Sequence, residues 1–549
     1  MKTILGINGG TRAGNQDSSA TIIANGQIIA CAEEERFTKI KHAPGVLPEN
    51  SIKFCLQQAN INIQNVDFVV FAGATYDSMT QILTNFFNFK FKYCPKIILI
   101  DHHLAHASSA YYVSGFDNSY IITADFSGDN RSTVLFYADR TGIKEITNYS
   151  KPNSLGLFYA AITQFLGFKY DNDECKTMAL AGYNSKTNSI VSQFLNITDK
   201  TYSLNTNFLD SRIMYGKSNP SRQEPLFNDY FIKQIQKTAR IENNGIDDFY
   251  LSVAKTAQES LEKAYFTLIK QLKNSQYKSN NLCLAGGVAL NAELNSKLAY
   301  SNEFDNMFVQ PVASDAGLSL GGALYVANKY NSLQINRMNS VYFGSEFSNK
   351  EIKKELNRVK TKYIYYESNM LTKIIAKRIA QGQIGAIFNG KMEYGPRALG
   401  NRSIIADPRS KTIKNILNKE FKQRETFQPF APSVLEEYAE EYFDFPNNTS
   451  ANFEFMVINA KIKQHRKNEI IATIHINNTA RVQIVKKDRN PFFYDIIKQF
   501  GYLTNTNVLL NTSLNKKGFP ITRTPNDALN VFYTTPLDFM VLGNYIIEK

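Results

Sequence analysis

The sequence predicts an α/β protein with more than one domain. Residues 2–7, 19–24 and 27–32 are short apolar runs of the kind that form β-strands. The last two are joined at Asn25-Gly26, a strong hairpin signal, so the α/β pattern has an antiparallel start. A chain of 549 residues suggests roughly two to four domains.

The later elements follow from the same periodicities. We expect helices over residues 51–58, 104–112, 249–272, 318–328 and 370–381. We expect strands over residues 68–71, 96–100, 120–124, 132–137, 282–284, 384–388, 470–475 and 507–510. Residues 185–245, rich in Asn and Ser, are interpreted as an insertion, and residues 330–350 as a linker. The predicted domains are therefore residues 1–335 and 350–549, without an internal repeat.

Composition excludes several classes of protein. Hydrophobic residues make up 43% and charged residues 20%, which excludes a disordered chain. No apolar run has membrane-spanning length, and the first residues read as a strand and not a signal peptide, so we expect a cytoplasmic protein with no membrane partner. The five scattered cysteines argue against a zinc cluster or a disulfide framework. The net charge of +13 fits phosphorylated or nucleic-acid partners, but the lysines are spread along the chain, which favours an ordinary solvated surface.

A histidine cluster marks a candidate metal site. His102 and His106 are four residues apart in a predicted helix, so they project from the same face, a common arrangement for holding a divalent metal. Three of the six histidines fall within these five positions. His103 lies about 100° away around the helix and is a weaker candidate. The alternative is a helix start that uses polar residues as caps.

Two aspartates are candidates for the remaining ligands. Asp125 ends a predicted strand, and Asp315 precedes a predicted helix. Two histidines and two aspartates make a mixed nitrogen and oxygen site, which suits iron, manganese or zinc better than calcium or magnesium. Taken singly, each aspartate could instead be a turn or cap residue.

Glycine-rich loops mark candidate nucleotide contacts. Gly286-Gly287 lies between a strand and a helix, where a ligand can approach the backbone and the helix N-terminus favours an anion. The alternative is a tight turn. A second candidate loop, residues 6–19, contains Gly9-Gly10.

The second half carries cations in an unusual setting. Arg397, Lys422, Arg424 and Arg481 stand among Gly, Pro and apolar residues, unlike ordinary surface charges. Guanidinium groups bind phosphate bidentately, and lysine adds a point charge. Ion pairing with Glu393 and Glu425 is the alternative, but the cations outnumber these acids, which favours a phosphate pocket.

Taken together, the motifs resemble the O-carbamoyltransferases that decorate antibiotics and nodulation factors. The resemblance covers nearly the whole chain. The matching stretches are residues 17–21, 33–37 with 41–42, 102–112, 154–159, 174–183, 285–295, 314–321, 395–403, 422–432 and 510–515.

The resemblance implies an N-terminal actin-like (ASKHA-type) domain similar to tRNA threonylcarbamoyl-transferring enzymes. It implies a C-terminal α/β domain similar to threonylcarbamoyl-adenylate synthase. The C-terminal domain would form carbamoyl-adenylate from carbamoyl phosphate and ATP with Mg²⁺, and the N-terminal domain would transfer the carbamoyl group to an acceptor hydroxyl beside a bound metal.

The resemblance also implies roles for individual residues. The metal, usually taken as Fe²⁺ with Mn and Zn as alternatives, would be held by His102, His106, Asp125 and Asp315. Catalytic roles are expected at Gln16, Asp17, Lys422 and Arg397. Nucleotide or carbamoyl phosphate contacts are expected at Ser127, Gly128, Gly286, Gly287, Asn291, Arg424, Arg481, Asn511 and Ser513.

The sequence departs from the family pattern in four places. Gln16 stands where the family usually has a histidine, a candidate general base, and glutamine cannot accept a proton at neutral pH. Phe126 replaces a glycine beside a predicted ligand, Gln428 replaces an arginine, and Phe519 replaces a glutamate. The acceptor step is therefore the one most open to change.

Other functions were weighed against this one. A carbamoyl-type tRNA-modifying enzyme is permitted by the charge, but no basic patch interleaved with aromatic residues stands out, so a nucleic-acid partner is not expected. A nucleotide-binding protein with a degenerate transfer site is disfavoured by the retention of all four predicted ligands. An actin-like kinase rests on fold analogy alone. We expect a small-molecule hydroxyl acceptor, and an oligomer is compatible with the sequence.

Overall fold

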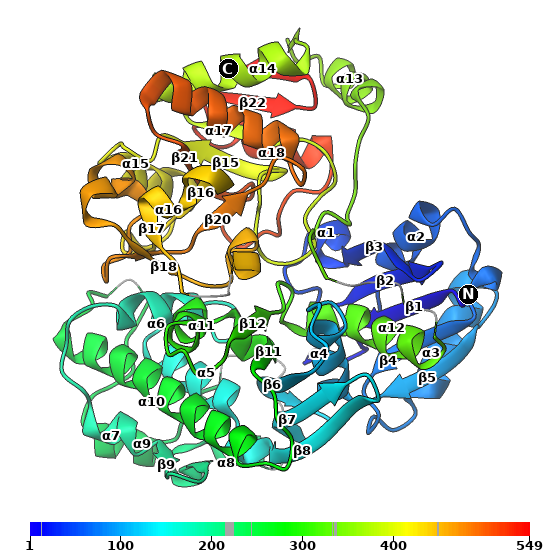
Figure 1. Cartoon of the computed structure of the whole chain (residues 1–549), viewed down its shortest axis with the longest axis vertical. Coiled ribbons are helices and arrows are strands. Elements are labelled where there is room, and N and C mark those ends of the chain that lie inside the picture. The colour runs from blue at the N-terminus through cyan, green and yellow to red at the C-terminus, as the bar shows by residue number, and fades with distance from the viewer. Residues whose placement is uncertain (13, 215–223, 243, 332, 334–336, 447–449) are drawn as a thin grey trace. The chain divides into compact units, whose positions relative to one another are not determined.

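The computed structural model describes all residues except 13, 215–223, 243, 332, 334–336 and 447–449. It divides into two compact units (Figure 1). The first comprises Met1–Ile28 and Pro44–Arg337, and the second comprises Ile29–Ala43 and Met338–Lys549. Residues 29–43 therefore group with the second unit, although the sequence assigns them to the first domain. Among the described helices, none has both the length and the apolar character to cross a membrane.

The chain opens with a five-stranded sheet in the order β3-β2-β1-β4-β5, which belongs to the first unit except for residues 29–33 of β3. Its strands are β1 (Ile4–Asn8), β2 (Ser19–Ala24), β3 (Gln27–Glu33), β4 (Phe68–Ala72) and β5 (Lys96–Ile100). Strand β1 pairs antiparallel with β2 and parallel with β4, which pairs parallel with β5. Every residue of β1 is buried, which explains why this strand reads as a continuous apolar run.

A second sheet of the first unit has the order β12-β11-β6-β7-β8. Counted from β6 and read from its other edge, this is the same strand order as in the first sheet. Its strands are β6 (Ser119–Gly128), β7 (Arg131–Asp139), β8 (Gly142–Ser150), β11 (Asn281–Ala285) and β12 (Asn306–Val309). Strand β6 pairs antiparallel with β7 and parallel with β11, as β1 does with β2 and β4. This repeated topology confirms the predicted actin-like α/β class, although the sequence shows no internal repeat.

Two helices connect the sheets of the first unit. Helix α12 (Leu318–Lys329) packs on β1, β2 and β4, and α4 (His102–Tyr111) packs on α12, β6 and β11 (Figure 1). A Cβ added to Gly321 would lie 1.8 Å from the Ala105 carbonyl oxygen, so glycine is required for this close packing. The metal-site residues lie around this helix pair.

The remaining helices of the first unit include a longer packed group. Helix α10 (Asp248–Lys273) packs on α5 (Leu155–Phe165) and α6 (Glu174–Ala181). Others are α2 (Glu49–Gln58), α3 (Met79–Phe91) and α11 (Ala292–Ala299). Within residues 185–245 the described elements are α7 (Ser189–Ser192), β9 (Leu195–Ile197), β10 (Tyr202–Leu204), α8 (Ser211–Met214) and α9 (Asp229–Ile235).

The second unit is built on an eight-stranded sheet in the order β13-β23-β22-β14-β15-β21-β16-β20. Its strands are β13 (Ile364–Tyr365), β14 (Gly385–Phe388), β15 (Arg402–Ala406), β16 (Ala431–Leu435), β20 (Gln483–Val485), β21 (Val508–Ser513), β22 (Phe539–Leu542) and β23 (Tyr545–Glu548). A small sheet holds β17 (Phe443–Asp444), β18 (Ala460–Ile462) and β19 (Thr479–Ala480). The unit also contains α1 (Glu35–Thr38), α13 (Asn349–Arg358), α14 (Ser368–Ala380), α15 (Ile413–Ile416), α16 (Ala439–Tyr442), α17 (Pro491–Thr504) and α18 (Pro525–Tyr533).

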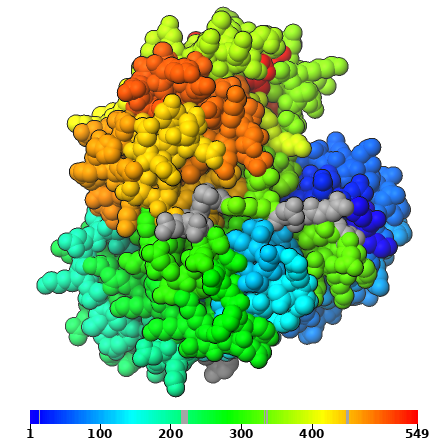
Figure 2. All heavy atoms as spheres, in the orientation of Figure 1, coloured from blue at the N-terminus to red at the C-terminus, as the bar shows by residue number. Residues whose placement is uncertain are grey.

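Each face of this eight-stranded sheet has its own core. Phe388 of β14 packs in a cluster with residues of α13 and α18. Its neighbour Ile387 packs in the other cluster with residues of α14 and α17, as the alternation of a strand requires. Helices α14 and α17 lie side by side, and their atoms, yellow-green and orange, adjoin in the space-filling view (Figure 2).

The predicted strand over residues 470–475 is wrong. The chain forms a 3-10 turn there, Ile471–Thr473. The Thr473 hydroxyl donates to the Ile470 carbonyl within the turn, and the backbone N–H of Ala472 donates to the distant Pro408 carbonyl, so these bonds replace a strand ladder. The buried Ile470 and Ala472 gave the segment its strand-like apolar character.

Candidate functional site

The histidines stand at the start of α4, directly after β5. Asp101 caps this helix, because its Oδ1 accepts a hydrogen bond of 2.9 Å from the backbone N–H of Leu104. Its side chain also forms an ion pair with Arg131. The cap fixes the first turn, so His102 and His106 project together from one face, with both side chains buried.

Asp125 lies where β6 becomes irregular. The ladder with β7 pairs Ala124 with Thr133 and resumes only at Gly128 with Arg131, which leaves Asp125, Phe126 and Ser127 in a bulge. The Asp125 Oδ1 accepts a hydrogen bond from the Phe126 backbone N–H at 2.7 Å. A carboxylate in mid-strand is thereby turned out of the ladder and toward α4.

Asp315 comes from a third segment. It opens the 3-10 turn Asp315–Gly317, which leads into α12 and is capped by the Ser314 hydroxyl. The Ser19 hydroxyl at the start of β2 donates to the Ala316 carbonyl at 2.8 Å, which ties this turn to the first sheet.

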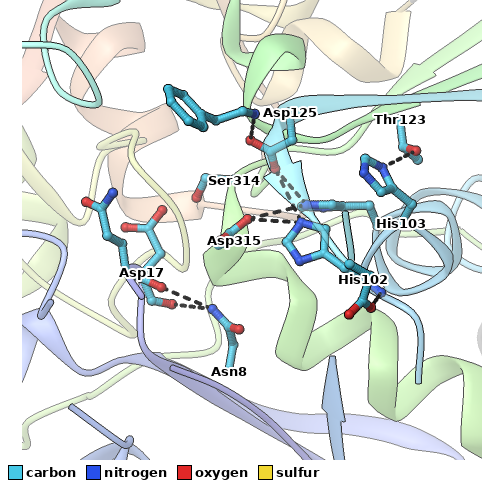
Figure 3. A network of polar contacts seen from close by, with 12 residues as sticks. Asn8, Asp17, His102, His103, Thr123, Asp125, Ser314 and Asp315 are labelled. Carbon is cyan, nitrogen blue, oxygen red and sulfur yellow. Dashed lines mark hydrogen bonds and ion pairs between the residues drawn. The ribbon is translucent and has the colours of Figure 1, made fainter. Parts of the chain in front are cut away.

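The four predicted ligands meet in one place. One donor atom from each residue, His102, His106, Asp125 and Asp315, lies within 4.8 Å of all the others. The His106 Nε2 is 3.0 Å from Asp125 Oδ2 and 3.5 Å from Asp315 Oδ1, and the His102 Nε2 is 3.6 Å from both carboxylates (Figure 3). The His102 Nε2 is buried without a hydrogen-bond partner in the described chain. This donor set and this orphaned nitrogen fit a transition metal.

The electrostatics of the cluster agree with this fit. Burial alone would lower the pKa of His106, but hydrogen bonds to Asp125 and Asp315 raise it to about 9. Burial opposes ionisation of Asp125, but both histidines hold its pKa well below the usual value. Burial and the adjacent Asp125 carboxylate raise the pKa of Asp315. A cation between the carboxylates would relieve their repulsion and replace the proton on the imidazole.

His103 and Asp129 support the cluster without joining it. The His103 ring points to Thr123, with Nδ1 2.9 Å from its Oγ1 (Figure 3). Burial and the neighbouring imidazoles lower the pKa of His103 well below its usual value. Asp129 accepts the backbone N–H of His102 at 2.8 Å and that of Thr75 at 2.9 Å. The sequence did not predict that Asp129 holds these backbone N–H groups in place. The available signal was its position in a turn that contains a glycine.

The glycines predicted to contact the nucleotide also lie very close to neighbouring atoms of the protein. A Cβ at Gly128 would lie 2.1 Å from the His102 ring, and one at Gly286 would lie 2.3 Å from the Ala124 carbonyl oxygen. A Cβ at Gly287 would approach Asp125 Oδ1 to 3.0 Å. Gly287 opens a 3-10 turn, and the Asn291 side chain caps the helix α11 that follows. These residues therefore shape the wall around the metal cluster.

Gln16 and Asp17 lie in the loop before β2. The Asn8 amide donates to both of their carbonyl oxygens at 3.2 Å, and Asp17 has a left-handed backbone with φ of 53°. The Gln16 side-chain amide donates to Asp171 Oδ2 at 3.1 Å. The structure thus places a carboxylate directly beside the position where sequence reasoning found no base.

The second unit contains a buried lysine. The Lys422 Nζ donates to the Ser513 carbonyl at 2.6 Å and to the Asn515 side-chain oxygen at 2.8 Å. No carboxylate pairs with it among the described residues. Burial and the nearby Arg424 guanidinium lower the pKa of Lys422 well below its usual value. Sequence reasoning missed Asn515, which follows the predicted Ser513 by two residues.

More cations gather near Lys422. Burial and the charge of Arg424 lower the pKa of Lys414. Burial and the charges of Arg481 and Lys414 lower the pKa of His475 to about 3. Arg424 is oriented by the Asn418 side chain at 2.7 Å and stacks on the Phe430 ring. We call Lys414, Lys422, Arg424 and Arg481 the cation cluster, beside which His475 is held neutral; crowded cations of this kind favour a bound anion.

Other predicted pocket residues have different positions. Arg397 is half-buried in the turn before β15. Asn511 is buried, and its amide donates to Ser433 Oγ at 3.1 Å and Gln483 Oε1 at 3.0 Å, which ties β21 to its neighbours. The neighbouring Arg402 is also buried, and its guanidinium donates to backbone carbonyls.

Two protein-family models match the chain. One, described as Carbamoyltransferase N-terminus, matches residues 4–93 and 73–324, and the other, Carbamoyltransferase C-terminus, matches residues 376–549. The chain is 33% identical to nodulation protein NolNO of Sinorhizobium fredii over 97% of this chain and 79% of that protein. It is 34% identical to nodulation protein NolO of Bradyrhizobium diazoefficiens over 82% of this chain and 79% of that protein.

Solved structures give weaker similarity. Component A of (R)-2-hydroxyglutaryl-CoA dehydratase from Acidaminococcus fermentans matches with a TM-score of 0.37 and 15% identity, covering 60% of this chain and 99% of that one. The ROK hexokinase from Thermus thermophilus matches with a TM-score of 0.28 and 12% identity, covering 59% of this chain and 98% of that one.

Proposed function

We propose that this chain activates a carbamoyl group with ATP and transfers it to a hydroxyl of a small-molecule acceptor. The chain belongs to the carbamoyltransferase family and is a transferase. The observation that carries this proposal is Lys422, a buried lysine inside the cation cluster with no carboxylate partner among the described residues. Carbamoyl phosphate and ATP are anions, and fixed cations in a site shielded from water bind such groups and stabilise charge that develops on them.

The activation step belongs to the second unit. Carbamoyl phosphate, ATP and one water give carbamoyl-adenylate, phosphate and pyrophosphate. Lys422 supplies a point charge and Arg424 and Arg481 supply guanidinium groups for the phosphate oxygens, with Arg397, Asn511 and Ser513 as further candidates. A bound anion beside Lys422 would favour its charged form and offset the effect of burial on its pKa.

The transfer step belongs to the first unit. His102, His106, Asp125 and Asp315 would hold Fe²⁺, Mn²⁺ or Zn²⁺, which supplies charge to polarise the carbamoyl carbonyl and neutralise the leaving AMP. Ser127, Gly128, Gly286, Gly287 and Asn291 form the surrounding wall for the adenylate.

A proton must leave the acceptor hydroxyl as its oxygen attacks the carbamoyl carbon. Gln16 cannot take this proton, but its amide holds the Asp171 carboxylate at 3.1 Å. Asp171 is therefore our candidate base, with Asp17 shaping the loop beside it.

The direct test omits the acceptor. Purified protein is incubated with ATP, Mg²⁺ and carbamoyl phosphate, and pyrophosphate is measured. We expect release that requires carbamoyl phosphate and falls about 100-fold or more in Lys422→Ala, because Lys422 is the buried cation of the cluster and its loss removes a fixed charge from the phosphate oxygens. Lys419→Ala, an exposed lysine three residues earlier, is the matched control. Absence of release from metal-loaded wild-type protein would sink the two-step function.

A further inference from the structure

The segment of residues 29–43 is part of the second unit although it precedes most of that unit by about three hundred residues in the chain. It contains the end of β3 and the short helix α1. Its backbone joins that unit at Cys31, whose N–H donates to the Phe343 carbonyl. The side chains of Glu33 and Arg36, with 7% and 5% exposure, are buried there. Buried charges of this kind need a specific partner, since burial without one is costly.

That partner is the backbone of Gly395. The Arg36 guanidinium donates to the Gly395 carbonyl at 2.8 Å, and the Gly395 N–H donates to Glu33 Oε1 at 3.1 Å. Arg36 also forms ion pairs with Glu33 and, at 2.7 Å, with Glu35. The carbonyl and the N–H of Gly395 are thus held by Arg36 and Glu33, which also form an ion pair with each other.

The far side of the same loop is anchored independently. Glu393 Oε1 accepts the backbone N–H of Leu399 at 2.7 Å and that of Asn401 at 2.9 Å. Gly395 has φ of 111°, a conformation that favours glycine, so the turn has a defined shape. Arg397 lies between these two anchors, and its backbone position depends on both.

We propose that Glu33 and Arg36 are positioning residues for Arg397: they fix the backbone of Gly395, two residues before it, so that Arg397 keeps its place for the phosphate group that the proposed function assigns to it. This inference rests on the proposed function. Two further contacts hold the segment in place, the ion pair of Lys39 with Asp527 and the Arg523 guanidinium over the Phe37 ring at 4.4 Å. An element from the beginning of the chain therefore completes the activation site of the second unit.

The test is a double-mutant cycle on pyrophosphate release with carbamoyl phosphate and ATP as probes. We expect Arg36→Gln to raise the KM for one of these anions about tenfold or more with a smaller change in kcat, because a mispositioned arginine weakens binding. Arg36→Lys keeps the charge and should recover part of the loss. In Arg36→Gln/Arg397→Gln the effect should be no larger than in Arg397→Gln alone, because Arg36 acts through Arg397.

The controls separate this inference from the proposed function. Arg358→Gln removes an exposed arginine of the same unit that pairs with Glu355, and should leave both KM values unchanged. The positioning role would be overturned by unchanged kinetics in Arg36→Gln. It would also be overturned if the effects of Arg36→Gln and Arg397→Gln multiply in the double variant. In both cases wild-type release would still support the two-step function. Should Arg36→Gln fail to fold, as judged by thermal unfolding, Glu33→Gln decides, and wild-type KM values in that variant overturn the inference. Absence of release from the wild type removes both proposals together.

Discussion

The metal cluster of the first unit and the cation cluster of the second each combine buried with partly buried ionisable side chains, but they balance charge in opposite ways. In the first, two carboxylates face two imidazoles, and the pKa of His106 rises to about 9. In the second, cations lie near cations, and the pKa values of Lys414, Lys422 and His475 fall. The first arrangement suits a bound cation and the second a bound anion. A single chain thus offers two complementary environments, one for each of the two steps that we propose.

The largest effect that separates the two sites is expected for His106→Ala. This change removes a predicted ligand from the metal cluster. Mutating a residue that only supports a ligand typically lowers metal affinity about 10- to 100-fold, so we expect bound metal to fall at least this far. Metal content of the purified protein, measured by elemental analysis, is the readout. Pyrophosphate release should persist, because Lys422 and its neighbours are untouched. Loss of pyrophosphate release together with metal would contradict the division of the two steps.

Asp171→Asn tests the transfer step without touching a ligand. General acid–base groups typically contribute 10²- to 10⁴-fold, so we expect about a 100-fold slower transfer with normal pyrophosphate release. Water can serve as the acceptor, and ammonium from the carbamate product reports transfer. Asp173→Asn is the matched control, since this acid of the same turn pairs with Lys176 at 3.3 Å. An unchanged ratio of ammonium to pyrophosphate in Asp171→Asn would exclude this base.

Gly128→Ala tests how closely the wall of the metal cluster is fitted. The added Cβ would meet the His102 ring at 2.1 Å, so the ring must move. We expect metal affinity to fall about tenfold, with overpacking that costs about 1–3 kcal/mol of stability. Gly245→Ala is the control, because a Cβ there meets nothing within 4 Å. Wild-type affinity in Gly128→Ala, measured by metal titration, would show that the ring position does not limit binding.

The two sites also differ in how far the sequence could predict them. The spacing of His102 and His106 is local, and helix geometry converts it directly into a shared face. Asp125 and Asp315 could be proposed as ligands, but the bulge that turns Asp125 toward α4 is a feature of strand pairing. The carboxylate beside Gln16 could not be predicted, because Asp171 is 155 residues away in the sequence and contacts Gln16 only in the fold.

In the second unit the sequence predicted cations but not their partners. Asn515 and Glu33 act through backbone and side-chain contacts that no spacing reveals. The assignment of residues 29–43 to the second unit has the same cause, since a buried pair such as Glu33 and Arg36 looks like surface charge in the sequence. Helix α5 was not predicted: its residues are mostly apolar and nearly all of them are buried, so no polar face marks it as a helix in the sequence.

The last expected effect is on stability alone and concerns helix α10 of the first unit. Glu262 of α10 is buried, and its carboxylate accepts a hydrogen bond of 3.0 Å from Gln258, which also bonds to Asn291. Burial raises its pKa from 4.5 to about 7. The folded state therefore binds this proton more tightly than the unfolded state, and the free energy of unfolding falls as the pH rises between these two values.

Glu262→Gln should remove the part of this slope that Glu262 contributes. The variant should match the wild type below about pH 4.5 and exceed it above pH 7 by up to about 3 kcal/mol, because each pKa unit corresponds to about 1.4 kcal/mol. Urea unfolding at pH 5, 6, 7 and 8 gives the comparison, with Glu259→Gln on the same helix as control. A wild-type slope in Glu262→Gln would show that another group carries the pH dependence, and Glu174, whose pKa is also raised to about 7 by burial, is the next candidate in the first unit.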